Sequence, residues 1–173
     1  NGLAPVFKSV KIAEKLLFEI ETSKSYKTPA GNSKYCKNIL DLVLGKAIID
    51  ERGDKIGSIQ IPGAGSGLRI AGELIKNNLQ NKLISIPDPT WGQQPFMFKK
   101  SGLKVINHTY YNQQNNFLDF DNMIIDLKKL KSGDAVLLHG CCHNPTGADL
   151  SVDQWEQVAY ICLKQGILPF IDL

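Results

Sequence analysis

Hydrophobic residues follow a helical spacing near the start of the chain. Residues 4–20, APVFKSVKIAEKLLFEI, place apolar side chains three and four positions apart, which predicts an amphipathic helix. Residues 21–38 are polar with a Pro-Ala-Gly turn, and we expect a surface excursion there. A short apolar segment follows at 39–45, and residues 50–55, DERGDK, are expected to form a turn.

From residue 57 onward, short apolar runs alternate with amphipathic segments. The predicted strands are 57–62, 82–87, 103–111, 135–140 and 167–173, and the predicted helices are 67–79, 93–102, 119–131 and 151–165. Ser151 and Gln154 have the spacing of a capping box at the start of the last helix. This alternation indicates an α/β fold, a mainly parallel sheet with helices on both faces.

Composition and charge narrow the class of protein. The chain is 43% hydrophobic and 21% charged, as in an ordinary globular domain. Its net charge of +3 is small and its basic residues are mixed with acidic ones, so we expect no nucleic-acid partner. No apolar run approaches the roughly 18–20 residues that span a bilayer, and we expect no membrane partner. Four cysteines without a disulfide pattern, and no signal peptide, favour a cytoplasmic location.

The two ends of the sequence suggest a fragment. The chain begins with Asn1 rather than methionine and stops at Leu173, directly after a predicted core strand. We therefore expect it to be part of a longer protein.

Ligands of parallel α/β sheets bind beyond the carboxyl ends of the strands. The first candidate there is the glycine-rich turn PGAGSG at 62–67. Its backbone N–H groups can approach an anion at a helix N-terminus, although a tight turn with positive φ explains the glycines equally well. Leu68 replaces the third glycine of a dinucleotide fingerprint, so an anion here would be a single phosphate group.

The second candidate is HGCCHNPTG at 139–147. Zinc pairs usually have a gap between their ligands, and adjacent Cys141 and Cys142 would point in opposite directions at a strand end, so a metal is disfavoured. A catalytic thiol needs a base and a lowered pKa, which a sequence does not reveal. Asn144 precedes a proline that favours an extended backbone, and its amide can hold a phenolate-like oxygen or a carboxylate.

Two further strand ends carry candidate residues. Trp91 follows a proline turn, and its ring either packs in the core or forms a wall against a planar ligand. Asp172 ends the last apolar strand, where a carboxylate must be paired to stay charged. It either caps a following helix or pairs with a protonated ring nitrogen.

The order of these motifs resembles the fold-type I pyridoxal-phosphate enzymes, specifically the class I aspartate/aromatic aminotransferases. The resemblance covers nearly the whole chain, through residues 42–75, IPDPTWGQQPFMFKKSGLKV at 86–105, HGCCHNPTGADLSVDQWEQVA at 139–159, and GILPFIDL at 166–173. It implies the three-layer large domain of that family. The chain would be part of that domain, with residues 19–43 as a surface insertion and with the small domain and the rest of the large domain absent.

The resemblance also implies a role for each matched residue in binding pyridoxal 5′-phosphate. Ala64 and Gly65 match the turn that receives the phosphate, and Ser66 would replace a hydroxyl residue that the family has at position 65. Trp91 matches the aromatic residue on the pyridine ring, near the substrate. The remaining matches are Asn144, for the 3′-oxygen and the substrate carboxylate; Asp172, for the ring nitrogen; and His139, behind the cofactor.

The sequence departs from the family in further ways. A histidine that often supports the ring-nitrogen aspartate is Gln94 here, which weakens the electrostatic support for that aspartate. None of the lysines matches the family's Schiff-base position, and the family's cofactor tyrosine and two arginines also lie outside this chain. We therefore expect no catalytic residue within it, and no transamination by this polypeptide alone.

The resemblance implies that the longer protein is a homodimeric aminotransferase. It would move an amino group between an amino acid, aspartate or aromatic, and a 2-oxo acid. Two other readings stay open from the residues: a degenerate, non-catalytic cofactor-binding or interaction module, and a Rossmann-type oxidoreductase. Against an oxidoreductase, the sequence lacks the glycine spacing of a dinucleotide-binding motif and a clear ribose-binding acid.

Overall fold

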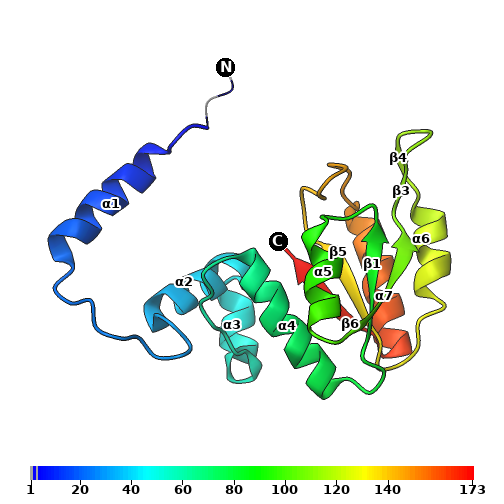
Figure 1. Ribbon diagram of the computed structural model, residues 1–173, viewed down its shortest axis with the longest axis horizontal. Coiled ribbons are helices and arrows are strands. Elements are labelled where there is room, and N and C mark those ends of the chain that lie inside the picture. Colours follow the sequence, from blue (N-terminus) through cyan, green and yellow to red (C-terminus); the bar gives the residue numbers. More distant parts are fainter. Residues whose placement is uncertain (1, 3) are drawn as a thin grey trace. The chain divides into compact units, whose positions relative to one another are not determined.

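The chain divides into two compact units in the computed structural model, which describes residue 2 and residues 4–173. The first unit ends at Gln60, and the second spans Ile61–Leu173 (Figure 1). The described helices include none with the length and apolar character needed to cross a membrane.

The first unit is helical. It contains α1 (Lys8–Ile20), α2 (Ser33–Leu44), α3 (Lys46–Arg52) and the short 3₁₀ turn η1 (Gly53–Lys55). Helix α1 confirms the amphipathic helix predicted over 4–20. The turn predicted over 50–55 is instead the end of α3 followed by η1.

Helix α2 corrects the last part of the polar surface excursion predicted over residues 21–38, because residues 33–38 are helical, whereas residues 21–32 are non-helical and almost all exposed. Asn32 starts the helix, because its side chain accepts hydrogen bonds from the backbone N–H groups of Lys34, at 3.0 Å, and Tyr35, at 3.1 Å. Cys36 is buried while most of the helix is exposed. The prediction divided these residues between a polar segment and a short apolar one, which concealed the helical period.

Residues 57–62 do not form the strand that their alternation predicts. Residues 57 to 60 are exposed, and Gln60 bonds with a turn instead of with a neighbouring strand. Its backbone N–H donates to the carbonyl of Ala30 and its Oε1 accepts from the N–H of Asn32, both at 2.9 Å. A strand needs a partner for its backbone groups, and within the described residues no strand pairs with this segment.

The second unit contains a four-stranded parallel sheet, as predicted. Its order is β2 (Lys104–Thr109), β1 (Leu83–Asp88), β5 (Ala135–His139) and β6 (Leu168–Asp172) (Figure 1). Ile84 of β1 lies opposite Val105 on one side and Ala135 on the other. In the last pair of strands, His139 lies opposite Asp172.

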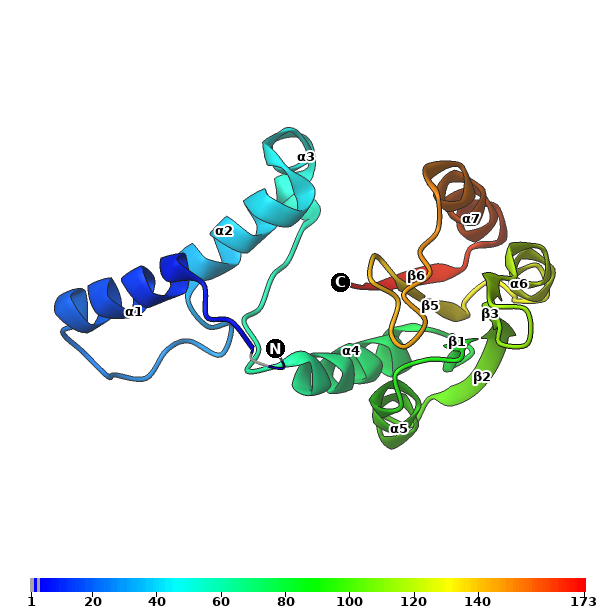
Figure 2. The same ribbon diagram turned by 90° about the horizontal axis from the view of Figure 1, so that it is seen from above.

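Helices cover both faces of this sheet, which confirms the predicted α/β class. One face carries α4 (Ala64–Asn78) and α5 (Gln93–Lys100), and the other carries α6 (Phe120–Leu127) and α7 (Val152–Gln165) (Figure 2). Strand β5 is buried throughout and contributes to both cores. Ala135 and Leu137 join the apolar cluster under α4 and α5, whereas Val136 and Leu138 join the cluster under α6 and α7.

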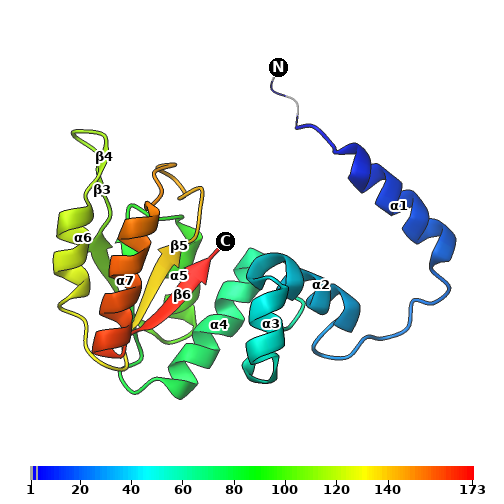
Figure 3. The same ribbon diagram turned by 180° about the vertical axis from the view of Figure 1, so that it is seen from behind.

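Helix α7 begins with the predicted capping box. The side chain of Ser151 accepts from the N–H of Gln154, and the side chain of Gln154 accepts from the N–H of Ser151 at 2.9 Å. The helix ends at Gly166, whose φ of 68° is a left-handed conformation that suits glycine. Figure 3 shows α7 running along β5 and β6, so this cap fixes where the helix covers the sheet.

The strand predicted over 103–111 is shorter than expected. After β2 ends at Thr109, the chain forms a small antiparallel hairpin from β3 (Tyr111–Asn112) and β4 (Phe117–Leu118). The polar residues between them form the turn, as the sequence indicates.

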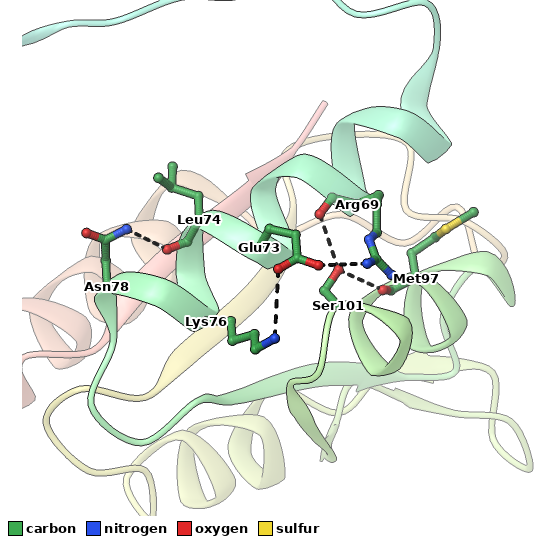
Figure 4. A network of polar contacts seen from close by, with 7 residues as sticks. All are labelled: Arg69, Glu73, Leu74, Lys76, Asn78, Met97 and Ser101. Atoms are coloured by element: carbon green, nitrogen blue, oxygen red, sulfur yellow. Dashed lines mark hydrogen bonds and ion pairs between the residues drawn. The ribbon is translucent and has the colours of Figure 1, made fainter.

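Helices α4 and α5 pack closely at Gly72. The hydroxyl of Ser101, just after α5, lies 3.2 Å from the carbonyl oxygen of Arg69 and 3.0 Å from that of Met97 (Figure 4). Beside this contact Arg69 pairs with Glu73 at 2.7 Å, but both side chains are well exposed and such a pair contributes little stability. The close approach therefore depends on the missing side chain at Gly72.

Replacing Gly72 with alanine is expected to destabilise the protein. The new Cβ would lie 2.5 Å from the Ser101 hydroxyl oxygen and 2.8 Å from its Cβ. Overpacking of this kind costs about 1–3 kcal/mol, more than the helix-propensity gain of about 1 kcal/mol. Urea denaturation would measure the change. Gly92→Ala is the matched control, because Gly92 has φ −56° and no atom within 4 Å of an added Cβ; equal stability of the two variants would contradict the packing argument.

Candidate active site

Three parallel strands end in polar residues at one edge of the sheet. Asp88 ends β1, His139 ends β5 and Asp172 ends β6. His139 and Asp172 are partners in the register, and the N–H of Gly140 donates to the backbone carbonyl of Asp172 at 2.7 Å. Two of the residues singled out in the sequence are therefore neighbours.

Gln94 joins these two strand ends through its side chain. It lies in the first turn of α5 and is completely buried, with 0% of its surface exposed. Its Nε2 donates to Oδ2 of Asp172 at 2.6 Å, and its amide lies 2.9–3.0 Å from Nε2 of His139. The hydroxyl of Thr90 bonds to its Oε1. Gln94, which stands where the family often has a histidine, is thus in direct contact with Asp172.

Asn144 approaches the same cluster through its backbone. Its N–H donates to Nδ1 of His139 at 3.2 Å, while its carboxamide is exposed. Asn144, His139 and Asp172 are therefore brought together. The amide of Asn144 is left available for a ligand at this edge.

Asp149 holds the turn between β5 and α7 in shape. Its carboxylate accepts from the backbone N–H groups of Cys142 and His143, both at 2.8 Å. These backbone hydrogen bonds lower the pKa of Asp149. The sequence contains no signal for this contact, because an aspartate after a glycine turn is common.

The two cysteines of this turn lie beyond the strand whose alternation was expected to point them in opposite directions. Strand β5 ends at His139, so the alternation of a strand no longer applies, and Cys142 has a left-handed φ of 51°. Both thiols are exposed, and a hydrogen bond with the Cys142 side chain raises the pKa of Cys141. A raised pKa does not favour a nucleophilic thiolate. The described residues contain no cluster of three or more metal-ligating side chains.

Three aromatic rings stack beneath the turn. Tyr110 lies over His143 with ring centroids 3.8 Å apart, and His143 lies 4.4 Å from the ring of His139. The phenol of Tyr110 donates to the carbonyl of Ala148 at 2.6 Å, and burial raises its pKa to about 12. The stack supports His139 from the side of the core.

Burial keeps the inner histidines neutral. Desolvation lowers the pKa of His108 to about 3, and desolvation together with the neighbouring His139 lowers the pKa of His143 to about 4. His108 is held by the hydroxyl of Ser85, 3.0 Å from its Nδ1. Desolvation also lowers the pKa of His139.

These shifts predict that stability falls as the pH is lowered from about 6.5 toward 4 and then 3. In this window the unfolded chain binds protons on these histidines and the native chain does not, so each contributes a slope of about 1.4 kcal/mol per pH unit. Denaturant unfolding at pH 7, 5 and 4 would measure it. His108→Gln is expected to reduce the slope by about one proton, since carboxylates contribute equally in both proteins. An unchanged slope would contradict the burial of a neutral His108.

The glycine-rich turn lies at the N-terminus of α4. Gly63 precedes the helix with an extended φ of 166°, and no described side chain caps the first turn. An added Cβ at Gly63 would meet nothing within 4 Å, so space is open there, whereas Gly65 lies beside Met97 of α5. The hydroxyl of Ser66 donates to the carbonyl of Gly63 at 2.7 Å. An uncapped helix N-terminus with open space is suited to an anion.

Trp91 lies two residues before α5. Its carbonyl accepts from the N–H of Gln94 at 2.9 Å, and its partly buried ring packs against the apolar cluster under α4 and α5. Core packing therefore accounts for one side of the indole, and its use as a wall for a ligand stays a prediction.

The class that these observations define is an α/β protein with an acid and an amide beyond the carboxyl ends of parallel strands, and with an uncapped N-terminus on helix α4. The chain matches the family described as aminotransferase class I and II over residues 1–173, and it belongs to that family.

Known relatives agree with this assignment. The chain is 40% identical over 175 residues to an aromatic-amino-acid aminotransferase of Pseudomonas aeruginosa and 37% identical over 174 residues to an aspartate aminotransferase of Escherichia coli. Each comparison covers 99% of this chain and 43% of the relative. The chain thus spans less than half the length of these proteins.

A solved structure shows the same fold. An aromatic-amino-acid aminotransferase from Burkholderia pseudomallei, covalently bound to pyridoxal phosphate, matches 97% of this chain and 42% of its own with a TM-score of 0.92 and 30% identity.

Proposed function

We propose that the protein carrying this chain is a pyridoxal-phosphate-dependent aminotransferase. It moves an amino group between an amino acid, aspartate or aromatic, and a 2-oxo acid. The observation that carries the proposal is the cluster in which Asp172, Gln94, His139 and Asn144 meet at the strand ends. The family and the names of the relatives support the reaction class.

The residues present fit the cofactor. The uncapped first turn of α4, with Ala64, Gly65 and Ser66, would receive the phosphate through its backbone N–H groups. When bound, pyridoxal phosphate accepts the electron pair released at the amino-acid Cα. Asp172 would keep a proton on the ring nitrogen, because a carboxylate favours the protonated form of a neighbouring base.

The other proposed contacts orient the two ligands. Asn144, with its exposed carboxamide, would donate to the cofactor's 3′-oxygen and lie near the substrate carboxylate. Trp91 would present its free face to the ring, and His139 would support the site from behind. A homodimer and a cytoplasmic location complete the proposal.

The proposal is tested on the full-length protein with its cofactor. We expect the visible absorbance of the bound cofactor to shift on addition of aspartate, tyrosine or phenylalanine, and to return when a 2-oxo acid is added. The 173-residue chain is the internal control, because it contains no lysine at the family's catalytic position and is expected to show no transfer. Cofactor binding without a shift for any amino acid would instead favour a non-catalytic module.

A further inference from the structure

Asp172 and Asn144 belong to different elements, yet a continuous series of hydrogen bonds joins them. The series runs from the backbone N–H of Asn144 to Nδ1 of His139, at 3.2 Å, and from Nε2 of His139 to the amide of Gln94. It ends with the bond from Gln94 to Oδ2 of Asp172 at 2.6 Å. His139 and Gln94, the two middle members, are both buried.

The direction of the first bond shows which tautomer of His139 is present in the structure. A backbone N–H only donates, so Nδ1 of His139 must accept and carries a lone pair. A neutral imidazole then has its proton on Nε2. An imidazolium would place a second N–H against the N–H of Asn144 and lose this bond.

The directions of the other bonds determine the orientation of the Gln94 amide, that is, which way its oxygen and its NH₂ group face. A carboxylate oxygen accepts, so the NH₂ group of Gln94 must face Asp172, and its Oε1 faces away. The proton on Nε2 of His139 then donates to this Oε1 at 3.0 Å. The reverse bond, from Nε2 of Gln94 at 2.9 Å, would require an unprotonated Nε2, which the first step excludes.

We propose that Gln94 is a positioning residue that holds Asp172 and that, together with the backbone N–H of Asn144, it keeps His139 as its neutral Nε2–H tautomer. The part of this inference that concerns the cofactor depends on the proposed function, in which Asp172 serves the ring nitrogen. A neutral partner leaves the full charge of the carboxylate for that nitrogen, whereas an imidazolium would share it.

The surroundings of His139 agree with a neutral ring. Burial lowers its pKa, while the carboxylates of Asp172 and Asp149 oppose that effect. The ring of His143, also neutral, lies 4.4 Å away. Gln94 adds the geometric reason, because its Oε1 accepts a proton from a neutral imidazole without supplying a charge that would favour the imidazolium.

Nuclear magnetic resonance of the imidazole nitrogens tests the tautomer directly. The chain contains three histidines, so ¹⁵N-labelled protein gives a simple spectrum that His139→Asn assigns. We expect Nε2 of His139 to be protonated and Nδ1 to be unprotonated at pH 7. A protonated Nδ1 with a bare Nε2, or an imidazolium at this pH, would overturn the proposal. The tautomer is read from the unmodified chain, and the variant serves only to assign its signals.

Two substitutions then test the role of Gln94. Gln94→Leu removes the acceptor of the Nε2 proton, and we expect the ¹⁵N signals of His139 to move toward a mixture of tautomers. Gln94→Glu places a carboxylate beside Nε2, and we expect the pKa of His139 to rise by at least one unit. Gln165→Leu is the matched control, because it removes a part-buried amide that bonds to the carbonyls of Lys128 and Leu130 instead. Unchanged His139 signals in both Gln94 variants would refute the positioning role.

The outcome separates the two proposals. A chain with the expected tautomer that fails to support amino transfer in the full-length protein would remove the proposed function and leave the hydrogen-bond series intact. An active full-length protein with the other tautomer would do the reverse.

Discussion

Asp172→Asn is expected to lower the amino-transfer turnover number of the full-length protein roughly 10²–10³-fold, the usual effect of removing one electrostatic partner of the reacting group. The amide has nearly the same shape, and its oxygen can still accept the hydrogen bond from Gln94, so the fold is retained. The negative charge is lost, however, and with it the group that would keep the cofactor nitrogen protonated. Steady-state kinetics with saturating aspartate and a 2-oxo acid would measure the change.

Asp50→Asn provides the matched control for this substitution. Asp50 is an exposed aspartate in α3, and its change also removes one negative charge. We expect its turnover number to equal that of the unmodified protein. If Asp172→Asn were as active as this control, the assignment of Asp172 to the ring nitrogen would be incorrect.

Phe98→Ala is expected to reduce the free energy of unfolding by about 3–5 kcal/mol. Phe98 is completely buried, and its ring meets that of Phe170 edge-on, with centroids 5.7 Å apart and planes at 88°. It therefore attaches α5 to β6. Helix α5 contains Gln94, and strand β6 contains Asp172. Removing the ring leaves a cavity that this packed region fills only in part. Urea denaturation would measure the loss.

Phe96→Ala is the control on the same helix. Its ring is 52% exposed and lies under the ammonium group of Lys100, 5.6 Å from the ring centroid. We expect a change below about 1 kcal/mol. Similar losses for both phenylalanines would show that the contact between α5 and β6 does not stabilise the protein as described.

The sheet and its covering helices were predictable from the sequence because their signals are local. Strand β5 is five consecutive apolar or strand-end residues with a helix on either side along the chain. The capping box at Ser151 is complete within four residues. A short apolar run flanked by turns identifies a buried strand, and the alternation with helices identifies parallel pairing.

Other parts of the fold depend on contacts that a local pattern does not contain. Residues 57–62 have the alternation of a strand but have no pairing partner among the described residues. Helix α2 was missed because its first half is mostly polar and its apolar residues gather in its second half, and only Cys36 of its residues is buried. In both segments the environment of the residues, rather than their own period, decides the structure.

The sequence predicted where the candidate residues lie in the fold but not how they are connected. Order and type of the motifs placed Asp172, Asn144 and His139 at strand ends, and the structure brings them together. Gln94 is linked to His139, which is 45 positions away in the chain, and to Asp172, which is 78 positions away. A buried glutamine has no sequence signature, because only the completed sheet shows what its amide faces.

The central place of β5 has a consequence for hydrogen exchange. This strand has a neighbour on each side and an apolar cluster on each face, so its amide protons have no route to solvent short of complete unfolding. They are expected to exchange most slowly in the second unit. The turn with Asn144 therefore follows the strand that is expected to exchange most slowly in that unit. Local unfolding of other parts of the unit leaves the residues at the start of this turn in place.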